Sequence, residues 1–111
     1  MSDQDISKLL EEIKRRILSV SSPERIVLFG SYAREQQHAD SDVDLLVIEK
    51  DVKAPRAESV RIRRALRGLM VPIDVLAATP EQVERHRDSP GLVYGPALRE
   101  GRVIYDRATS S

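Results

Sequence analysis

Two aspartates separated by one residue, Asp42 and Asp44, have a spacing that indicates chemistry. They open an apolar run, Leu45–Ile48, that is typical of a buried strand. On a strand, residues two apart project from the same face, with Cα atoms roughly 6.5 to 7 Å apart. Two carboxylates so placed repel each other unless a cation lies between them, and aspartate oxygens suit Mg²⁺. The pair therefore predicts a magnesium site, although a lone Asp42 after Asp40-Ser41 would more often be a turn residue.

A third aspartate, Asp74, lies inside a second apolar run, Ile73–Leu76. A carboxylate on a buried face is costly, so this position needs compensation. If the two strands pair, one metal could be held by Asp42 and Asp44, and a second, bridged metal could involve Asp74. Two cations held in this way clamp the attacking and leaving oxygens of an in-line displacement.

The Gly30-Ser31 turn follows a short apolar run, Ile26–Phe29, and precedes a predicted helix. Glycine lets a phosphate approach the backbone, and a helix N-terminus offers free N–H groups and partial positive charge. The Ser31 hydroxyl can donate to the same anion or cap the helix, and Arg34 lies three residues on, within reach of a phosphate oxygen. An ordinary strand-to-helix turn is the simpler interpretation of this segment taken alone.

Helices and short strands alternate along the chain and must position these groups. The periodicity and the Gly and Pro punctuation predict an α+β fold, a mixed sheet with helices packed on it. We expect helices at 6–17, 31–35, 55–68, 80–88 and 92–100, and strands at 26–29, 41–48, 72–77 and 103–105. One domain, 1–111, accounts for the length, with 107–111 as a frayed tail.

Composition excludes several classes of function. The 18 basic residues balance 18 acidic ones, so no net field draws the chain to nucleic acid or to an anionic membrane. The absence of cysteine excludes disulfides, cysteine nucleophiles and zinc–cysteine sites. The sequence carries no apolar run of signal-peptide or membrane-spanning length, which predicts a cytoplasmic protein.

Three motifs together resemble one family: Gly30-Ser31-Tyr32-Ala33-Arg34, Ser41–Val47 with its Asp-x-Asp, and Ile73–Leu76 with the third aspartate. They resemble the polymerase-beta-like nucleotidyltransferase superfamily, above all the minimal nucleotidyltransferases that act as antitoxins paired with HEPN-domain toxins. The resemblance implies Mg²⁺-dependent transfer of AMP from ATP, with pyrophosphate leaving.

The resemblance also implies roles for the site residues. Asp42 and Asp44 would hold the metals on the triphosphate. Asp74 would hold the metal that activates the attacking hydroxyl and could also accept its proton. Gly30 and Ser31 would bind the β- and γ-phosphates.

Arg34 would assist phosphate binding, and Glu35 departs from the glycine that many relatives carry after this arginine. An added carboxylate there is harmless if it points to solvent and weakens triphosphate binding if it does not.

The acceptor implied by the resemblance is a tyrosine of a partner HEPN toxin, which makes this chain an antitoxin in a hetero-oligomer. A run of arginines could form the docking face, or be a solvated helix face: Arg56, Arg61, Arg63, Arg64 and Arg67. Two alternatives stay open, namely an antitoxin that acts by complex formation alone and a nucleotidyltransferase for small molecules. Direct binding of nucleic acid is not expected.

Overall fold

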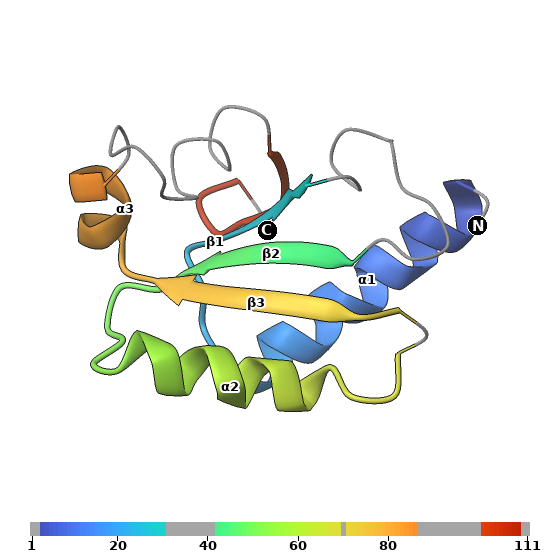
Figure 1. Cartoon of the computed structure of the whole chain (residues 1–111). Helices are drawn as coiled ribbons and strands as arrows, with labels where there is room; N and C mark the ends of the chain where they lie inside the picture. The colour runs from blue at the N-terminus through green and yellow to red at the C-terminus, as the bar shows by residue number, and fades with distance from the viewer. Residues whose placement is uncertain (1–2, 31–41, 70, 87–100, 110–111) are drawn as a thin grey trace.

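A mixed sheet forms the frame of the molecule (Figure 1). The structure is a computed structural model and describes residues 3–30, 42–69, 71–86 and 101–109. Within these ranges the elements follow in the order α1 (Asp3–Val20), β1 (Arg25–Phe29), β2 (Val43–Ile48), α2 (Pro55–Ala65), β3 (Ile73–Ala78), α3 (Pro80–His86) and β4 (Arg102–Asp106). None of the helices in these ranges is long and apolar enough to cross a membrane.

The strand order in the sheet is β3-β2-β1-β4. β1 runs antiparallel to both of its neighbours, whereas β2 and β3 are parallel and are joined by the crossover through α2. In this register Asp44 stands opposite Phe29 of β1 on one side and opposite Asp74 of β3 on the other. The C-terminal end of β1 and the N-terminal ends of β2 and β3 therefore meet at one end of the sheet.

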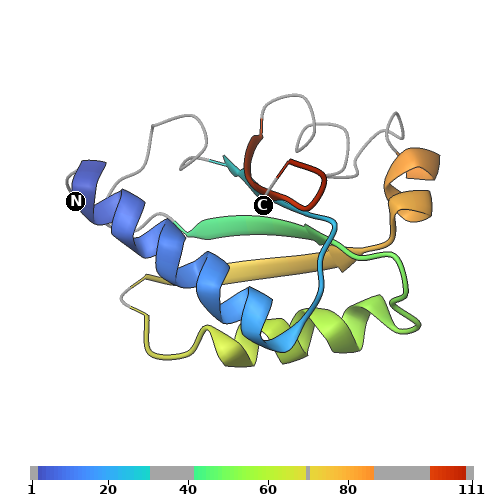
Figure 2. The ribbon, with the colours of Figure 1, turned by 180° about the vertical axis from the view of Figure 1, so that it is seen from behind.

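One face of the sheet is covered by α1 and α2 (Figures 1 and 2). Ile13 and Ile17 of α1 and Ile62 of α2 are fully buried against this face. The strands contribute alternate residues to the same core, because successive side chains of a strand point to opposite faces. The helical spacing that predicted α1 thus corresponds to the stripe that packs on the sheet.

The other face carries a smaller apolar cluster of Val27, Leu46, Ile48, Ala78 and Val83. Val83 comes from α3, whose first turn is fixed by reciprocal hydrogen bonds. The Gln82 N–H donates to Thr79 Oγ1 at 3.1 Å, and the Thr79 N–H donates to Gln82 Oε1 at 3.0 Å. This capping box satisfies two N–H groups at the start of the helix, as the threonine and proline predicted.

The predicted fold class is confirmed, with differences at the ends of elements. Helix α2 ends at Ala65 rather than near Gly68, because the N–H groups of Leu66 and Arg67 bond carbonyls three residues back and Gly68 is left-handed with φ +85°. The predicted helices at 31–35 and 92–100 lie outside the described residues. Part of the predicted tail, residues 107–109, forms a turn in which the Thr109 N–H donates to the Asp106 carbonyl at 3.2 Å.

Candidate active site

Parallel pairing of β2 and β3 brings Asp44 and Asp74 side by side. They are partners in the register, which places their Cβ atoms about 5 Å apart. Both side chains point away from the helix-covered core, because their neighbours Val43 and Val75 pack into that core. Asp42 precedes Asp44 by two residues and is exposed, as is Asp74. The two strands pair in parallel, which is the condition for Asp74 to lie beside Asp44.

The three carboxylates interact electrostatically. The pKa of Asp44 is raised above its ordinary value, first by burial of this half-buried side chain and then by the negative charges of Asp74 and Asp42. The protein therefore concentrates negative charge at one point, and no basic side chain among the described residues lowers the pKa of Asp44 in return. A divalent cation at this position would relieve the repulsion.

Gly30, the residue directly after β1, packs on this cluster. Gly30 has φ +76°, a left-handed conformation that glycine adopts without strain. A Cβ at this position would overlap Asp44 Oδ2 and would lie 3.3 Å from Asp44 Cγ. Glycine is therefore required both by its backbone conformation and by the close approach of the carboxylate. Ser31, Arg34 and Glu35 lie outside the described residues, so their roles remain predictions.

The chemistry of the cluster fits magnesium. Mg²⁺ takes hard oxygen ligands and keeps several waters or phosphate oxygens, so one or two carboxylates are sufficient protein ligands. Among the described residues, no three acidic, histidine or cysteine side chains are grouped closely enough to enclose an ion by themselves. Asp42, Asp44 and Asp74 therefore form an open cluster, and the two-metal site remains a prediction.

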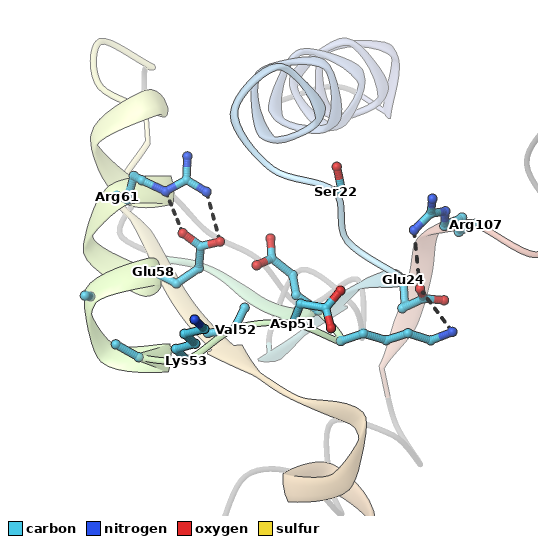
Figure 3. A pocket seen from close by; sticks show the side chains of 12 residues that line it. Ser22, Glu24, Asp51, Val52, Lys53, Glu58, Arg61 and Arg107 are labelled. Atoms are coloured by element: carbon cyan, nitrogen blue, oxygen red, sulfur yellow. Dashed lines mark hydrogen bonds and ion pairs between the residues drawn. The ribbon is translucent and has the colours of Figure 1, made fainter.

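A pocket of about 420 Å³ lies at the opposite end of β2, about 16 Å along the strand from Asp44 (Figure 3). Glu58 pairs with Arg61 on one side of it, and Glu24 pairs with Arg107 on the other. Arg61 also donates to the carbonyl of Val20, so this arginine is engaged within the fold rather than free to dock a partner.

Glu49, which also lines this pocket, was missed by the sequence reasoning. Its side chain is only 5% exposed, and its Oε1 has no hydrogen-bond partner among the described residues. Burial, followed by its hydrogen bond with Glu58, raises the pKa of Glu49 to about 7. In the sequence, a glutamate directly after the strand Val43–Ile48 is typical of an exposed residue at a strand end. No local pattern therefore indicates that Glu49 is buried.

Comparisons with known proteins identify the family of the chain. A model of the nucleotidyltransferase domain family matches residues 6–94. A protein of Methanocaldococcus jannaschii, named as a candidate protein adenylyltransferase, is 32% identical over 65 residues. That match covers 57% of this chain and 66% of the relative, which is less than two thirds of its length.

Two solved structures share the fold. A crystal structure from Sulfolobus solfataricus, described as a candidate nucleotidyltransferase, has a TM-score of 0.65 at 22% identity, covering 93% of this chain and 82% of that one. A toxin–antitoxin crystal structure with AMP-PNP has a TM-score of 0.52 at 18% identity, covering 87% of this chain and 73% of that one. With the family model matching most of the sequence, the predicted enzyme class is confirmed at the level of the family: this chain belongs to the nucleotidyltransferase domain family.

Proposed function

We propose that this chain transfers AMP from ATP to a hydroxyl group of a partner protein, in a reaction that depends on Mg²⁺. The observation that carries the proposal is the register that sets Asp44 beside Asp74, with Gly30 packed against Asp44. This arrangement brings the acidic cluster to the same end of the sheet as Gly30, the first residue of the proposed phosphate-binding turn.

The chain's own residues would act mainly by positioning. Asp42 and Asp44 would hold Mg²⁺, which neutralises triphosphate charge and orients the phosphates when bound. Asp74 would help to hold the metal that activates the acceptor hydroxyl, and would also accept the proton of that hydroxyl. The hydroxyl oxygen forms a bond to the α-phosphorus, the bond from the α-phosphorus to the bridging oxygen of pyrophosphate breaks, and pyrophosphate leaves. Preorganised charge and geometry supply most of the rate in such transfers.

A protein acceptor is supported by two of the comparisons. The archaeal relative is named for adenylyl transfer to protein, and one fold neighbour is a toxin–antitoxin structure with AMP-PNP. We infer that the acceptor is a tyrosine of a partner toxin of the HEPN class, that the chain acts as an antitoxin in a hetero-oligomer, and that it works in the cytoplasm. Ser31 and Arg34 complete the proposed phosphate-binding turn with Gly30.

The test is incubation of the purified chain with labelled ATP, Mg²⁺ and the protein encoded next to it, followed by intact mass analysis of that protein. We expect a gain of one or more AMP units that disappears in Asp42→Ala/Asp44→Ala and without Mg²⁺. Asp51→Ala is the matched control, because this exposed aspartate lies beyond the other end of β2.

Two results would contradict the proposal. No mass change, with a stable complex that still silences the partner, would indicate an antitoxin that works by binding alone. Transfer of AMP to small hydroxylated molecules but not to the partner would indicate a small-molecule nucleotidyltransferase.

A further inference from the structure

The outer edge of β3 presents backbone groups beside Asp74. Among the strands that the structure describes, β3 has only β2 as a neighbour. The Val43 N–H donates to the Pro72 carbonyl at 2.9 Å, so Pro72 and then Asp74 direct their backbone groups toward β2. Ile73 and Val75 therefore direct theirs outward, and in the described part of the chain no hydrogen bond reaches these outward groups. Such an edge is a template for another strand.

Ser59 of α2 closes one end of this edge. The Ala77 N–H, which also points outward, donates to Ser59 Oγ at 2.9 Å. A strand added to β3 would therefore be confined to Ile73–Val75, the half of the strand that contains Asp74.

Two exposed arginines follow the same side of α2. Arg63 comes one helical turn after Ser59, and Arg67 follows four residues later, in the turn beyond the end of the helix. Helix α2 runs antiparallel to β3 (Figure 1), and one turn of about 5.4 Å corresponds to roughly two residues of strand. Arg63 is therefore level with Val75, and Arg67 with Ile73. Neither arginine pairs with an acid within the described ranges.

We propose that the acceptor is an extended protein segment that adds to the edge of β3, with a hydroxyl residue beside Asp74 and an acidic residue on each side of it. This inference rests on the proposed function and names its substrate class. The residue opposite Asp74 shares its face of the sheet, with Cβ atoms about 5 Å apart. Its two neighbours point to the helix-covered face, where Arg63 and Arg67 would pair with their carboxylates.

Charge also disfavours a second copy of this chain on the same edge. Antiparallel pairing of two β3 strands about a twofold axis at Asp74 would set the two copies of Asp74 against each other. The arginines of α2 would meet their counterparts in the same way, and like charges directly opposite are destabilising. An acidic segment from another protein meets no such repulsion.

The first arm of the test compares three short peptides as AMP acceptors with ATP and Mg²⁺. Each carries one tyrosine, flanked by two glutamates, two alanines or two lysines. We expect the glutamate-flanked peptide to be used about tenfold faster than the lysine-flanked one, since two exposed ion pairs are exchanged for two repulsions. Arg63→Glu/Arg67→Glu should reverse this order, whereas Arg64→Glu, a neighbouring exposed arginine on another side of α2, should keep it.

The second arm tests the backbone pairing. Val75→Pro removes an outward N–H that β2 does not use, so the pairing of β2 and β3 is retained, and we expect use of every peptide to fall about tenfold. Val75→Ala is the matched comparison, because it shortens the side chain but keeps the N–H. Its rate of AMP transfer to the peptides should fall less than that of Val75→Pro. Equal use of the three peptides by the unaltered chain, or equal rates for the proline and alanine variants, would overturn the proposal.

The third arm measures docking without transfer, in Asp42→Asn/Asp44→Asn. Adding the glutamate-flanked peptide should slow hydrogen exchange of the Ile73 and Val75 amides. Slowed exchange with no transfer by the unaltered chain would support the docking edge and contradict the proposed function. Efficient transfer with unchanged exchange would contradict the docking edge and support the proposed function. Slow exchange that depends on the protein's own concentration, without peptide, would identify a second copy as the occupant and overturn the proposal.

Discussion

Glu49→Gln should remove a pH dependence of stability that the buried glutamate creates. The raised pKa, about 7 against 4.5 for an ordinary glutamate, means that the folded state binds a proton that the unfolded state releases. Stability from this group is therefore fully present below pH 4.5 and is lost as the pH rises through about 7. Glutamine keeps the size and hydrogen-bonding capacity of the protonated side chain without titrating.

The magnitude follows from the pH interval. Between pH 5.5 and 8.5 the unfolded side chain is ionised throughout, while the folded one loses its proton near 7. At about 1.4 kcal/mol per pKa unit, the loss is at most about 2 kcal/mol. Screening by water at the mouth of the pocket reduces it to about 1 kcal/mol or somewhat more. The pKa of Glu58 is lowered, first by its hydrogen bond from Arg61 and then by its hydrogen bond with Glu49, so Glu58 stays ionised across this interval.

The assay is urea unfolding of both proteins at pH 5.5, 7 and 8.5. The free energy of unfolding of the unaltered chain should fall with pH relative to that of Glu49→Gln, so that the variant is the more stable protein at pH 8.5. Differencing the two proteins removes the contributions of other titrating groups. Parallel pH profiles would refute the reasoning, because they would mean that Glu49 is ionised in the folded state at an ordinary pKa.

Three further substitutions have expected outcomes. Gly30→Ala should lower stability by about 1–2 kcal/mol and reduce AMP transfer at least tenfold, because it forces a left-handed alanine against Asp44; thermal melts and the transfer assay measure both effects. Asp44→Asn should abolish transfer and raise the melting temperature, since a neutral side chain relieves the repulsion from its neighbours; a lowered melting temperature would contradict this interpretation. Ser59→Ala should cost about 1 kcal/mol in urea unfolding, because the Ala77 N–H loses its acceptor, whereas Ser19→Ala, at an exposed hydroxyl on α1, should cost less.

The elements that bear the aspartates could be predicted because local patterns determine them. Apolar runs marked the strands, and the spacing of Ile13 and Ile17 marked α1. The sequence also indicated that Asp42 and Asp44 share a face, since the period of a strand is two. The position of Asp74 directly beside Asp44 could not be predicted in the same way. It depends on β3 being the neighbour of β2, and local composition does not specify the strand order.

Other features could not be read from the sequence because they arise from packing between distant segments. Glu49 is buried only because α2 and the segment before β1 close over the end of β2. Arg61 appeared to be one arginine among several, and its bond to Val20 requires α1 and α2 to lie together. The outward edge of β3 likewise could not be predicted, because it depends on the strand order of the sheet.

The crossover through α2 has a consequence for the order in which the molecule is made. A nascent chain that has emerged from the ribosome only as far as β2 contains Asp42 and Asp44 but lacks Asp74, the third aspartate of the cluster. A parallel neighbour cannot join through a tight hairpin, so the third carboxylate can arrive only after the whole connecting segment through α2 has been made. During synthesis the aspartate cluster is therefore assembled late, and ribosome-bound fragments shorter than β3 should be unable to transfer AMP.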